Sequence, residues 1–219
     1  MEYIKDTKED ALKFAAEKIK ESIDRIKKDI VVLGVPGGRS VAGIFKYLRK
    51  MKIDWKRVHI FMVDERMVSL SNKDCNFLIT QNELLKYIDI PKENVHPFNV
   101  IKGINKYEDE LVAIQDNYDI ILLSSGEDGH IGALYPNHHS IKDESDFFLT
   151  MDDSPKLPKE RMTMSKQLIR KSHYAIIMFL GKEKRQALAN FNDRYMSFKN
   201  CPAKLVKDIP NSFVIINRN

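Results

Sequence analysis

Cysteine is scarce in this chain, since its 219 residues include only Cys75 and Cys201, which form no CxxC pair. No disulfide framework is therefore expected, and this usage is typical of a reducing compartment. Long hydrophobic runs are also missing, so no segment approaches the length of a membrane span. Residues 1–29 are rich in Lys, Glu and Asp, which argues against a signal peptide. These absences predict a cytoplasmic protein with no membrane partner.

Blocks of a single charge are likewise missing. The chain has 36 basic and 31 acidic side chains and a net charge of +5, but the two signs are interspersed, as in "KDTKEDALK". Because no basic block is present, no nucleic-acid partner is expected. A mild positive balance fits a small anionic substrate as well as it fits plain solubility.

No internal repeat, low-complexity tract or long linker divides the sequence. A hydrophobic content of 43% and a charged content of 31% are ordinary for a globular protein, and the length is ample for a core. We therefore expect residues 1–219 to form a single α/β domain.

Apolar runs alternate with helical patterns along the chain. Apolar residues at three- and four-residue spacing predict a helix over 8–28, with Thr7 as its cap, before the buried strand "IVVLGV". Further strands are predicted at 58–63, 95–98, 119–123, 173–180 and 212–217, and helices at 41–51, 76–88, 107–115 and 182–191. This order predicts an open, doubly wound, mostly parallel sheet flanked by helices, similar to a Rossmann fold. Residues 137–165 show no clear pattern.

Four loops that follow predicted strands are rich in functional groups. They are "PGGRS" (36–40), "DER" (64–66), "SSGEDGH" (124–130) and "GKEK" (181–184). Right-handed crossovers place the carboxyl ends of parallel strands at one edge, where ligands of open α/β sheets bind. We therefore expect these four loops to converge in space.

The loop "PGGRS" joins a strand to a helix. Gly37 and Gly38 let the backbone approach a ligand, and the helix that starts near Arg39 and Ser40 offers free N–H groups to an anion. A tight turn that needs positive φ would use the same glycines, so this loop alone leaves both interpretations open.

Two cations in the other loops are candidates for anion binding. Arg66 could clamp a phosphate or carboxylate with paired hydrogen bonds, although the charges of 64–66 could also be simply solvated. Lys184 falls in the first turn of a predicted helix, where the helix dipole disfavours a cation. An anionic ligand would offset that cost; a tolerated surface lysine is the other interpretation.

His130 follows two glycines after the strand at 119–123. An imidazole is suited to moving protons near neutral pH, and the neighbouring Asp128 favours this role over a purely structural one. His138 and His139 lie nearby, but HExxH spacing is absent and no cysteine is close. A metal site is therefore not expected.

Together these loops resemble segments of the 6-phosphogluconolactonases, which share a superfamily with the glucosamine-6-phosphate deaminases. "GGRS" is similar to the family's GGSTP loop, "VDERMVSLSNKDCNF" to its DER segment, and "SSGEDGHIGALYP" to its GxGxDGHxASLFP segment. "RMTMS" and "GKEKRQAL" resemble two further segments, so the match runs along nearly the whole chain. Arg39, Val41 and Ser124 depart from the pattern, but they remove no candidate catalytic group.

The resemblance implies hydrolysis of 6-phospho-D-glucono-1,5-lactone in the oxidative pentose phosphate pathway, with no metal and no cofactor. His130 would be the general base, in one catalytic group with Asp64, Arg66 and Asp128. Asp64 would orient the histidine or the sugar, and Arg66 would orient the lactone or stabilise developing negative charge. The resemblance places the substrate phosphate among Gly37, Gly38, Arg39, Ser40, Arg161 and Lys184. The implied partner is thus a small sugar-phosphate lactone, and the protein is expected to be a monomer or small homo-oligomer.

Two alternatives accompany this prediction. The first alternative is a deaminase, and the deaminases have a DGHIAFNEP-like sequence at the histidine loop and DEY where this chain has DER. Arg66 and the missing glutamate in "GHIGALYP" therefore favour the lactonase. A non-catalytic sugar-phosphate sensor in a transcription regulator would normally carry a helix-turn-helix. The single helix predicted before "IVVLGV" leaves no room for that motif.

Overall fold

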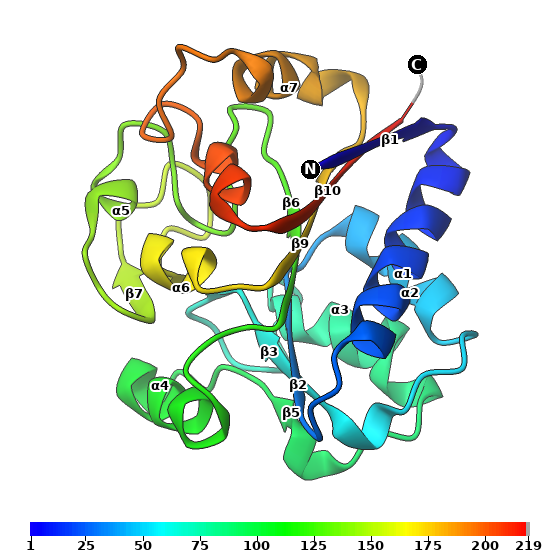
Figure 1. Ribbon diagram of the computed structural model, residues 1–219. Helices are drawn as coiled ribbons and strands as arrows, with labels where there is room; N and C mark the ends of the chain where they lie inside the picture. The colour runs from blue at the N-terminus through cyan, green and yellow to red at the C-terminus, as the bar shows by residue number, and fades with distance from the viewer. Residues whose placement is uncertain (218–219) are drawn as a thin grey trace.

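Seven parallel strands form the main sheet of the computed structural model, which describes residues 1–217 and, for Arg39, the backbone only. Their order is β1-β10-β9-β6-β2-β3-β5, and each neighbouring pair is parallel (Figure 1). The strands are β1 (Glu2–Asp6), β2 (Val31–Val35), β3 (Val58–Met62), β5 (Val95–His96), β6 (Ile120–Ser124), β9 (Tyr174–Phe179) and β10 (Asn211–Asn217). The predicted doubly wound, mostly parallel α/β fold is confirmed.

Helices cover both faces of this sheet (Figure 1). One face packs against α1 (Lys8–Arg25), α2 (Arg39–Leu48) and α3 (Asn76–Glu83). The other packs against α4 (Gly103–Ile114), α5 (His139–Lys142), α6 (Lys166–Arg170), α7 (Arg185–Asn192) and the 3₁₀ segment η5 (Pro202–Asp208). Short 3₁₀ turns lie at η1 (Trp55–Arg57), η2 (Leu85–Tyr87), η3 (Lys92–Asn94) and η4 (Lys182–Lys184).

Successive residues of β2 show how one buried strand serves both layers. Leu33 and Val35 belong to the apolar cluster under α1 and α2, whereas Val32 belongs to the cluster on the opposite face. A strand that is covered on both faces needs apolar residues at every position, which is why "VVLGV" reads as a continuous run. No helix in the described part of the chain is long and apolar enough to cross a lipid bilayer.

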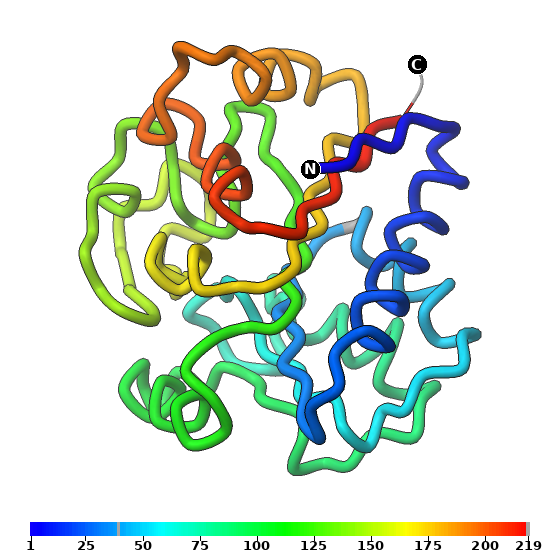
Figure 2. Tube along the Cα trace, viewed as in Figure 1, coloured from blue at the N-terminus to red at the C-terminus, as the bar shows by residue number. Residues whose placement is uncertain are grey.

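The first helix begins where the sequence predicts. The hydroxyl of Thr7 accepts the backbone N–H of Asp10 at 3.2 Å, and the helix ends at Arg25. Before it, β1 adds a parallel edge strand beside β10, so the first and last strands run side by side (Figure 2). The sequence did not predict β1, because its residues "EYIKD" are only half-buried or exposed and contain no apolar run.

A second, three-stranded antiparallel sheet corrects the expectation for two segments. It consists of β4 (Asp64–Arg66), β8 (Arg161–Met164) and β7 (Phe148–Met151), with β8 in the middle. The prediction of residues 64–66 as a loop was wrong, since they pair with β8. Strands of three or four residues are too short to show alternation, so residues 137–165 also gave no clear pattern.

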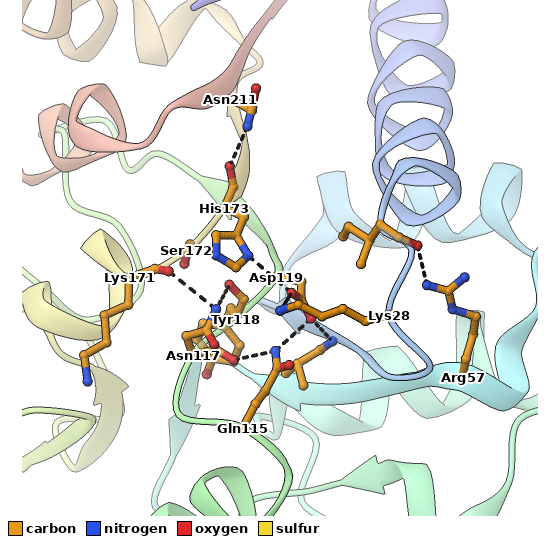
Figure 3. Close-up of polar contacts among 12 residues, drawn as sticks. Lys28, Arg57, Gln115, Asn117, Tyr118, Asp119, Lys171, Ser172, His173 and Asn211 are labelled. Atoms are coloured by element: carbon orange, nitrogen blue, oxygen red, sulfur yellow. Dashed lines mark hydrogen bonds and ion pairs between the residues drawn. The ribbon is translucent and has the colours of Figure 1, made fainter.

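Asp119 joins three strands of the main sheet at their amino ends (Figure 3). Its fully buried carboxylate accepts Val32 N at 2.9 Å and Gln115 Nε2 at 2.7 Å. Lys28 Nζ lies 3.0 Å and His173 Nδ1 3.3 Å from the other carboxylate oxygen. Its backbone also pairs with β2 and β9, so one residue fixes β2, β6 and β9 relative to one another.

Replacing Asp119 with alanine should lower the free energy of unfolding by about 2–4 kcal/mol. Each hydrogen bond to a charged group contributes about 1.5–3 kcal/mol, the bonds are not additive, and the buried N–H of Val32 would lose its partner. Urea unfolding measures the change. Asp116→Ala is the matched control, because this nearby side chain is 67% exposed and 3.8 Å from Lys171. It should change stability by less than about 0.5 kcal/mol, and equal losses in both variants would contradict the role given to Asp119.

Candidate active site

A polar cavity of about 250 Å³ opens at the carboxyl ends of β2 and β6. The chain passes from β2 to β3 on one side and from β6 to β9 on the other, so this is the switch point of the sheet. All four loops singled out from the sequence reach it. The lining residues are Pro36, Gly37, Gly38, Asp64, Arg66, Asn76, Ser124, Ser125, Gly126, His130, Gly132, Lys156, Arg161 and Lys184.

A larger cavity of about 680 Å³ shares Lys184 with the first cavity. Its described lining combines Lys5, Lys184, Arg185 and Asn217 with glycine and apolar residues. None of these is a histidine or a carboxylate, so this cavity offers no group for proton transfer near neutral pH. We therefore take the smaller cavity, which contains His130, as the candidate active site.

The imidazole of His130 belongs to the wall of this cavity, and its Nδ1 lies 2.5 Å from Oδ1 of Asp128. Burial alone would raise the pKa of the Asp128 carboxyl, but the hydrogen bond to His130 and the charges of His130 and Lys156 hold that pKa well below its usual range. Asp128 is therefore an ionised acceptor at neutral pH, and Nδ1 of a neutral His130 carries the hydrogen. The other nitrogen, Nε2, is then left with a lone pair that can take a proton.

Glycines in the same loop make room for this histidine. A Cβ atom on Gly126 would lie 2.1 Å from Cε1 and Nδ1 of His130, so a larger residue there would displace the ring. The N–H of Gly126 donates to the carbonyl of His130 at 2.8 Å, which closes the turn. Gly129 has a φ of +89°, a conformation that other residues rarely adopt. The loop thus needs glycine to hold His130 at the strand end.

Asp64 and Arg66 share one face of β4 because they are two residues apart on a strand. Both line the cavity. Asp64 is 5% exposed, and Asn76 Nδ2 donates to its Oδ2 at 3.1 Å. Burial raises the pKa of the Asp64 carboxyl. The positive charges of Arg66 and Arg161 lower this pKa, but their effect is smaller than that of burial.

The guanidinium of Arg66 is only partly satisfied by the protein. Nη1 donates to the carbonyl of Asp74 at 2.6 Å, whereas Nε is buried and has no hydrogen-bond partner. Buried donors are nearly always paired in native structures. Because Arg66 lines the cavity, its guanidinium is a candidate contact for an oxygen of a bound ligand.

Glu65, between these two residues, points the other way and is fully buried. Its carboxylate accepts the backbone N–H groups of Arg66 and Asn76 at 2.7 Å and of Phe77 at 2.8 Å, and Cys75 Sγ lies at 3.3 Å. Glu65 therefore caps the amino end of α3, which has no capping side chain of its own. Burial raises the pKa of the Glu65 carboxyl and raises that of the Cys75 thiol to about 11.

Arg161 is buried, with 4% of its surface exposed, and it holds in place the segment that carries Lys156 to the cavity. Its Nε donates to the carbonyl of Pro158 at 3.0 Å, and its Nη2 donates to those of Leu157 at 3.0 Å and Lys156 at 3.2 Å. Nη1 takes no part in these bonds. Lys156 itself lines the cavity, with its Nζ 3.2 Å from Glu127 Oε1.

The amino end of α2 is open at this cavity. Gly38 precedes the helix with a φ of +104° and provides no side-chain cap. The first N–H groups of this ten-residue helix are thus left to a ligand or solvent. Lys184 ends the η4 turn immediately before α7 and lines the same cavity.

The structure brings together most of the residues that the sequence nominated. His130, Asp64, Arg66, Gly37, Gly38, Arg161 and Lys184 line the cavity, and Asp128 contacts His130. Ser40 lies in the first turn of α2 but does not line the cavity, and the side chain of Arg39 lies outside the described residues. Asn76 and Lys156 were missed: Asn76 stood at the start of a predicted helix, and Lys156 lies in the segment without a pattern.

Comparison with known proteins gives consistent results. The family model described as glucosamine-6-phosphate isomerases/6-phosphogluconolactonase matches residues 6–214. A 6-phosphogluconolactonase from Borreliella burgdorferi is 31% identical over 196 residues, 84% of this chain and 83% of that protein. The crystal structure of 6-phosphogluconolactonase from Thermotoga maritima matches with a TM-score of 0.88 and 24% identity over 99% of both chains. A monomeric glucosamine-6-phosphate deaminase matches with a TM-score of 0.83 and 22% identity over 100% of this chain and 98% of the other. The fold alone therefore does not separate the two activities.

Replacing Glu65 with alanine should lower the free energy of unfolding by about 2–4 kcal/mol. Loss of the helix cap costs about 1 kcal/mol, and each buried donor left without a partner costs about 1–3 kcal/mol, with incomplete additivity. Urea unfolding is the measurement. Glu83→Ala, at the other end of α3, removes a partly exposed carboxylate 3.9 Å from Arg49 and should cost less than about 1 kcal/mol. A Glu65→Ala protein as stable as Glu83→Ala would exclude the capping role.

Proposed function

Since the chain belongs to the glucosamine-6-phosphate isomerase/6-phosphogluconolactonase family, we propose that it hydrolyses 6-phospho-D-glucono-1,5-lactone to 6-phosphogluconate in the oxidative pentose phosphate pathway. The family resemblance predicted from the sequence is confirmed. The observation that carries the proposed reaction is the His130–Asp128 pair at the wall of a polar cavity. We also propose that residues 1–219 act as one cytoplasmic domain and that the reaction uses no metal and no cofactor.

The charges of the cavity fit an anionic sugar phosphate. Arg66, Lys156, Arg161 and Lys184 line it, and Asp64 is the one carboxylate among the described lining residues. The phosphate is assigned to Lys184, Arg161 Nη1 and the N–H groups at the start of α2, next to Gly38. Charge-assisted hydrogen bonds of this kind are among the strong ones in proteins.

His130 acts as the general base. Its Nε2 takes a proton from a water molecule while the water oxygen attacks the lactone carbonyl carbon. The bond between that carbon and the ring oxygen then breaks, and the proton held by His130 passes to the departing ring oxygen, which becomes a hydroxyl. The product is a carboxylic acid that ionises at neutral pH.

Other groups prepare this step. Asp128 keeps the hydrogen of a neutral His130 on Nδ1, so that Nε2 is the basic nitrogen. The guanidinium of Arg66, which lines the cavity, is assigned to the negative charge that develops on the carbonyl oxygen. Asp64, held by Asn76, is assigned to the sugar hydroxyls, because a carboxylate accepts hydrogen bonds from them.

The deaminase alternative lacks one of its groups here. The resemblance places a proton-relay carboxylate in the FNEP part of the deaminase loop, where this chain has Tyr135. That tyrosine is 1% exposed, and its hydroxyl is bonded to Ser154 Oγ at 3.0 Å. Tyr135 has no carboxylate, which supports the lactonase.

A direct comparison of two substrates tests the proposal. The protein should open the phosphorylated lactone, and it should release no ammonia from glucosamine 6-phosphate at a comparable rate. His130→Ala should reduce lactone opening by about 10²–10⁴-fold, the usual effect of removing a general base. The lactone also opens spontaneously, so this background is subtracted. Ammonia release as fast as lactone opening would refute the proposal.

Two controls separate catalysis from folding. Circular dichroism and thermal unfolding should be unchanged in His130→Ala, since the ring lies at a cavity wall. Asp128→Asn preserves the shape of the carboxylate but does not fix the Nδ1–H form of His130, so kcat should fall in this variant also. A folded His130→Ala protein with wild-type rates would show that His130 is structural.

Removal of Lys184 should weaken substrate binding more than it slows the reaction. A phosphate contact is present in ground and transition states alike, so Lys184→Ala should raise KM more than it lowers kcat. One charge-assisted bond contributes about 1.5–3 kcal/mol, which corresponds to a loss in kcat/KM of roughly tenfold to hundredfold. The measurement uses phosphorylated and unphosphorylated lactone with each protein.

The control is Lys182→Ala, an exposed lysine in the same η4 turn that does not line the cavity. It should behave as wild type with both substrates. The loss in Lys184→Ala should be much smaller for the lactone without phosphate, because that substrate never used the contact. Equal losses with both lactones would mean that Lys184 acts at the carbonyl or in folding.

A further inference from the structure

Two histidines and an aspartate meet at the surface, outside the cavity of the candidate active site. Nε2 of His139 lies 2.8 Å and Nε2 of His138 lies 3.3 Å from Oδ1 of Asp153, and one side-chain atom from each residue lies within 4.8 Å of the others. The two imidazole rings have centroids 4.1 Å apart. None of the three residues lines the catalytic cavity.

The local fold fixes the position of His138. It is the residue before α5, and its Nδ1 accepts the backbone N–H of Ser140 at 3.2 Å and lies 3.0 Å from Ser140 Oγ. The ring also packs edge-on against Tyr135, with centroids 5.8 Å apart. Because Nδ1 is held by the protein, Nε2 is the nitrogen that faces Asp153.

Nε2 of His138 is an unexplained polar atom. It is inaccessible to solvent and has no hydrogen-bond partner, because its approach to Asp153 does not have hydrogen-bond geometry. Within residues 1–217 only Arg57 Nε and Arg66 Nε share this condition among side-chain nitrogens and oxygens. A buried polar atom without a partner costs about 1–3 kcal/mol, so it points to a group that binds there.

We propose that His138, His139 and Asp153 bind one divalent transition-metal ion through two imidazole nitrogens and one carboxylate oxygen. Imidazole nitrogens select zinc, cobalt or nickel rather than magnesium or calcium, which prefer oxygen ligands alone. Ligand atoms of a tetrahedral zinc ion are roughly 3.3 Å apart, given bonds of about 2.0–2.1 Å. The 3.3 Å from His138 Nε2 to Asp153 Oδ1 matches this spacing, whereas the 2.8 Å hydrogen bond between His139 Nε2 and Asp153 must lengthen as the ion enters, with water as the fourth ligand.

The surroundings supply the outer contacts that such a site needs. When Nε2 of His138 binds a metal, its Nδ1 must carry the hydrogen, so Nδ1 gives up the Ser140 N–H that it accepts here and donates instead to Ser140 Oγ at 3.0 Å. Metal-bound histidines almost always donate their second N–H in this way.

The ion would tie two separate segments together. Asp153 directly precedes Ser154, whose Oγ donates to Tyr135 at 3.0 Å and accepts the N–H of Lys156 at 3.2 Å. Lys156 lines the catalytic cavity. The metal would therefore anchor the 153–156 segment to α5, as a structural ion that takes no part in the hydrolysis.

Metal titration of the full-length protein tests this inference. After treatment with a chelator and its removal, the protein is titrated with ZnCl₂ by calorimetry and with CoCl₂ by visible absorption. We expect one ion per chain and cobalt bands of a four-coordinate site. At an ion concentration 100 times the Kd, Tm should rise by roughly 5–10 °C.

Three single variants locate the ion. His138→Asn keeps a side-chain acceptor that can cap α5 but removes the imidazole; His139→Asn and Asp153→Asn each remove one ligand. Each should weaken binding at least about tenfold, since loss of even an outer contact of a metal ligand costs that much. The Tm of each variant without metal shows whether it is folded. Should one variant fail to fold, the other two still locate the ion.

Two further variants serve as controls. His59→Asn disrupts the other close histidine pair, in which His59 Nδ1 lies 3.1 Å from His96 Nε2, and His130→Ala removes the catalytic imidazole. Both should bind the ion as wild type does. Absence of saturable one-to-one binding, retention in all three ligand variants, or loss in either control would overturn the proposal.

Discussion

Four donors from two segments of the chain converge on the buried carboxylate of Glu65. This contact attaches the amino end of α3 to β4 and thereby sets Asn76 against Asp64. It also fixes which face of β4 is buried, because Glu65 can point into the core only if Asp64 and Arg66 point to the cavity. The positions of Asp64, Arg66 and Asn76 in the candidate active site therefore depend on a carboxylate that does not itself line the cavity.

The part of the fold that the sequence predicts is the part governed by local rules. Continuous apolar runs identify β2, β3, β6, β9 and β10, since a strand covered on both faces must be apolar throughout. Once these strands are parallel, the loops after them must share one edge, which is why the glycine loop, the DER segment, His130 and Lys184 meet at one cavity. The family resemblance then supplies the chemistry that spacing alone leaves open.

What the sequence does not predict depends on contacts between distant segments. Lys156 reaches the cavity because the buried guanidinium of Arg161 binds three carbonyls of its loop, and no local pattern signals that arrangement. The sequence around His138 and His139 likewise predicted no metal site, because the third candidate ligand, Asp153, comes from a different loop. The short strands of the second sheet were missed for the same reason: pairing with β8, not propensity, makes residues 64–66 a strand.

Histidine–aspartate contacts recur in this molecule, and their surroundings decide what each can do. The carboxylate of Asp119 is fully buried and bound by several donors, so its contact with His173 belongs to the framework of the sheet. Asp128 instead holds a single imidazole at a cavity wall, where the opposite nitrogen can exchange a proton with water. Asp153 lies between two imidazoles, one of which has a buried nitrogen without a partner. The same pair of residue types thus forms a structural clamp and, in the roles that we propose, a base and a metal ligand set, according to burial and to the number of donors that share the carboxylate.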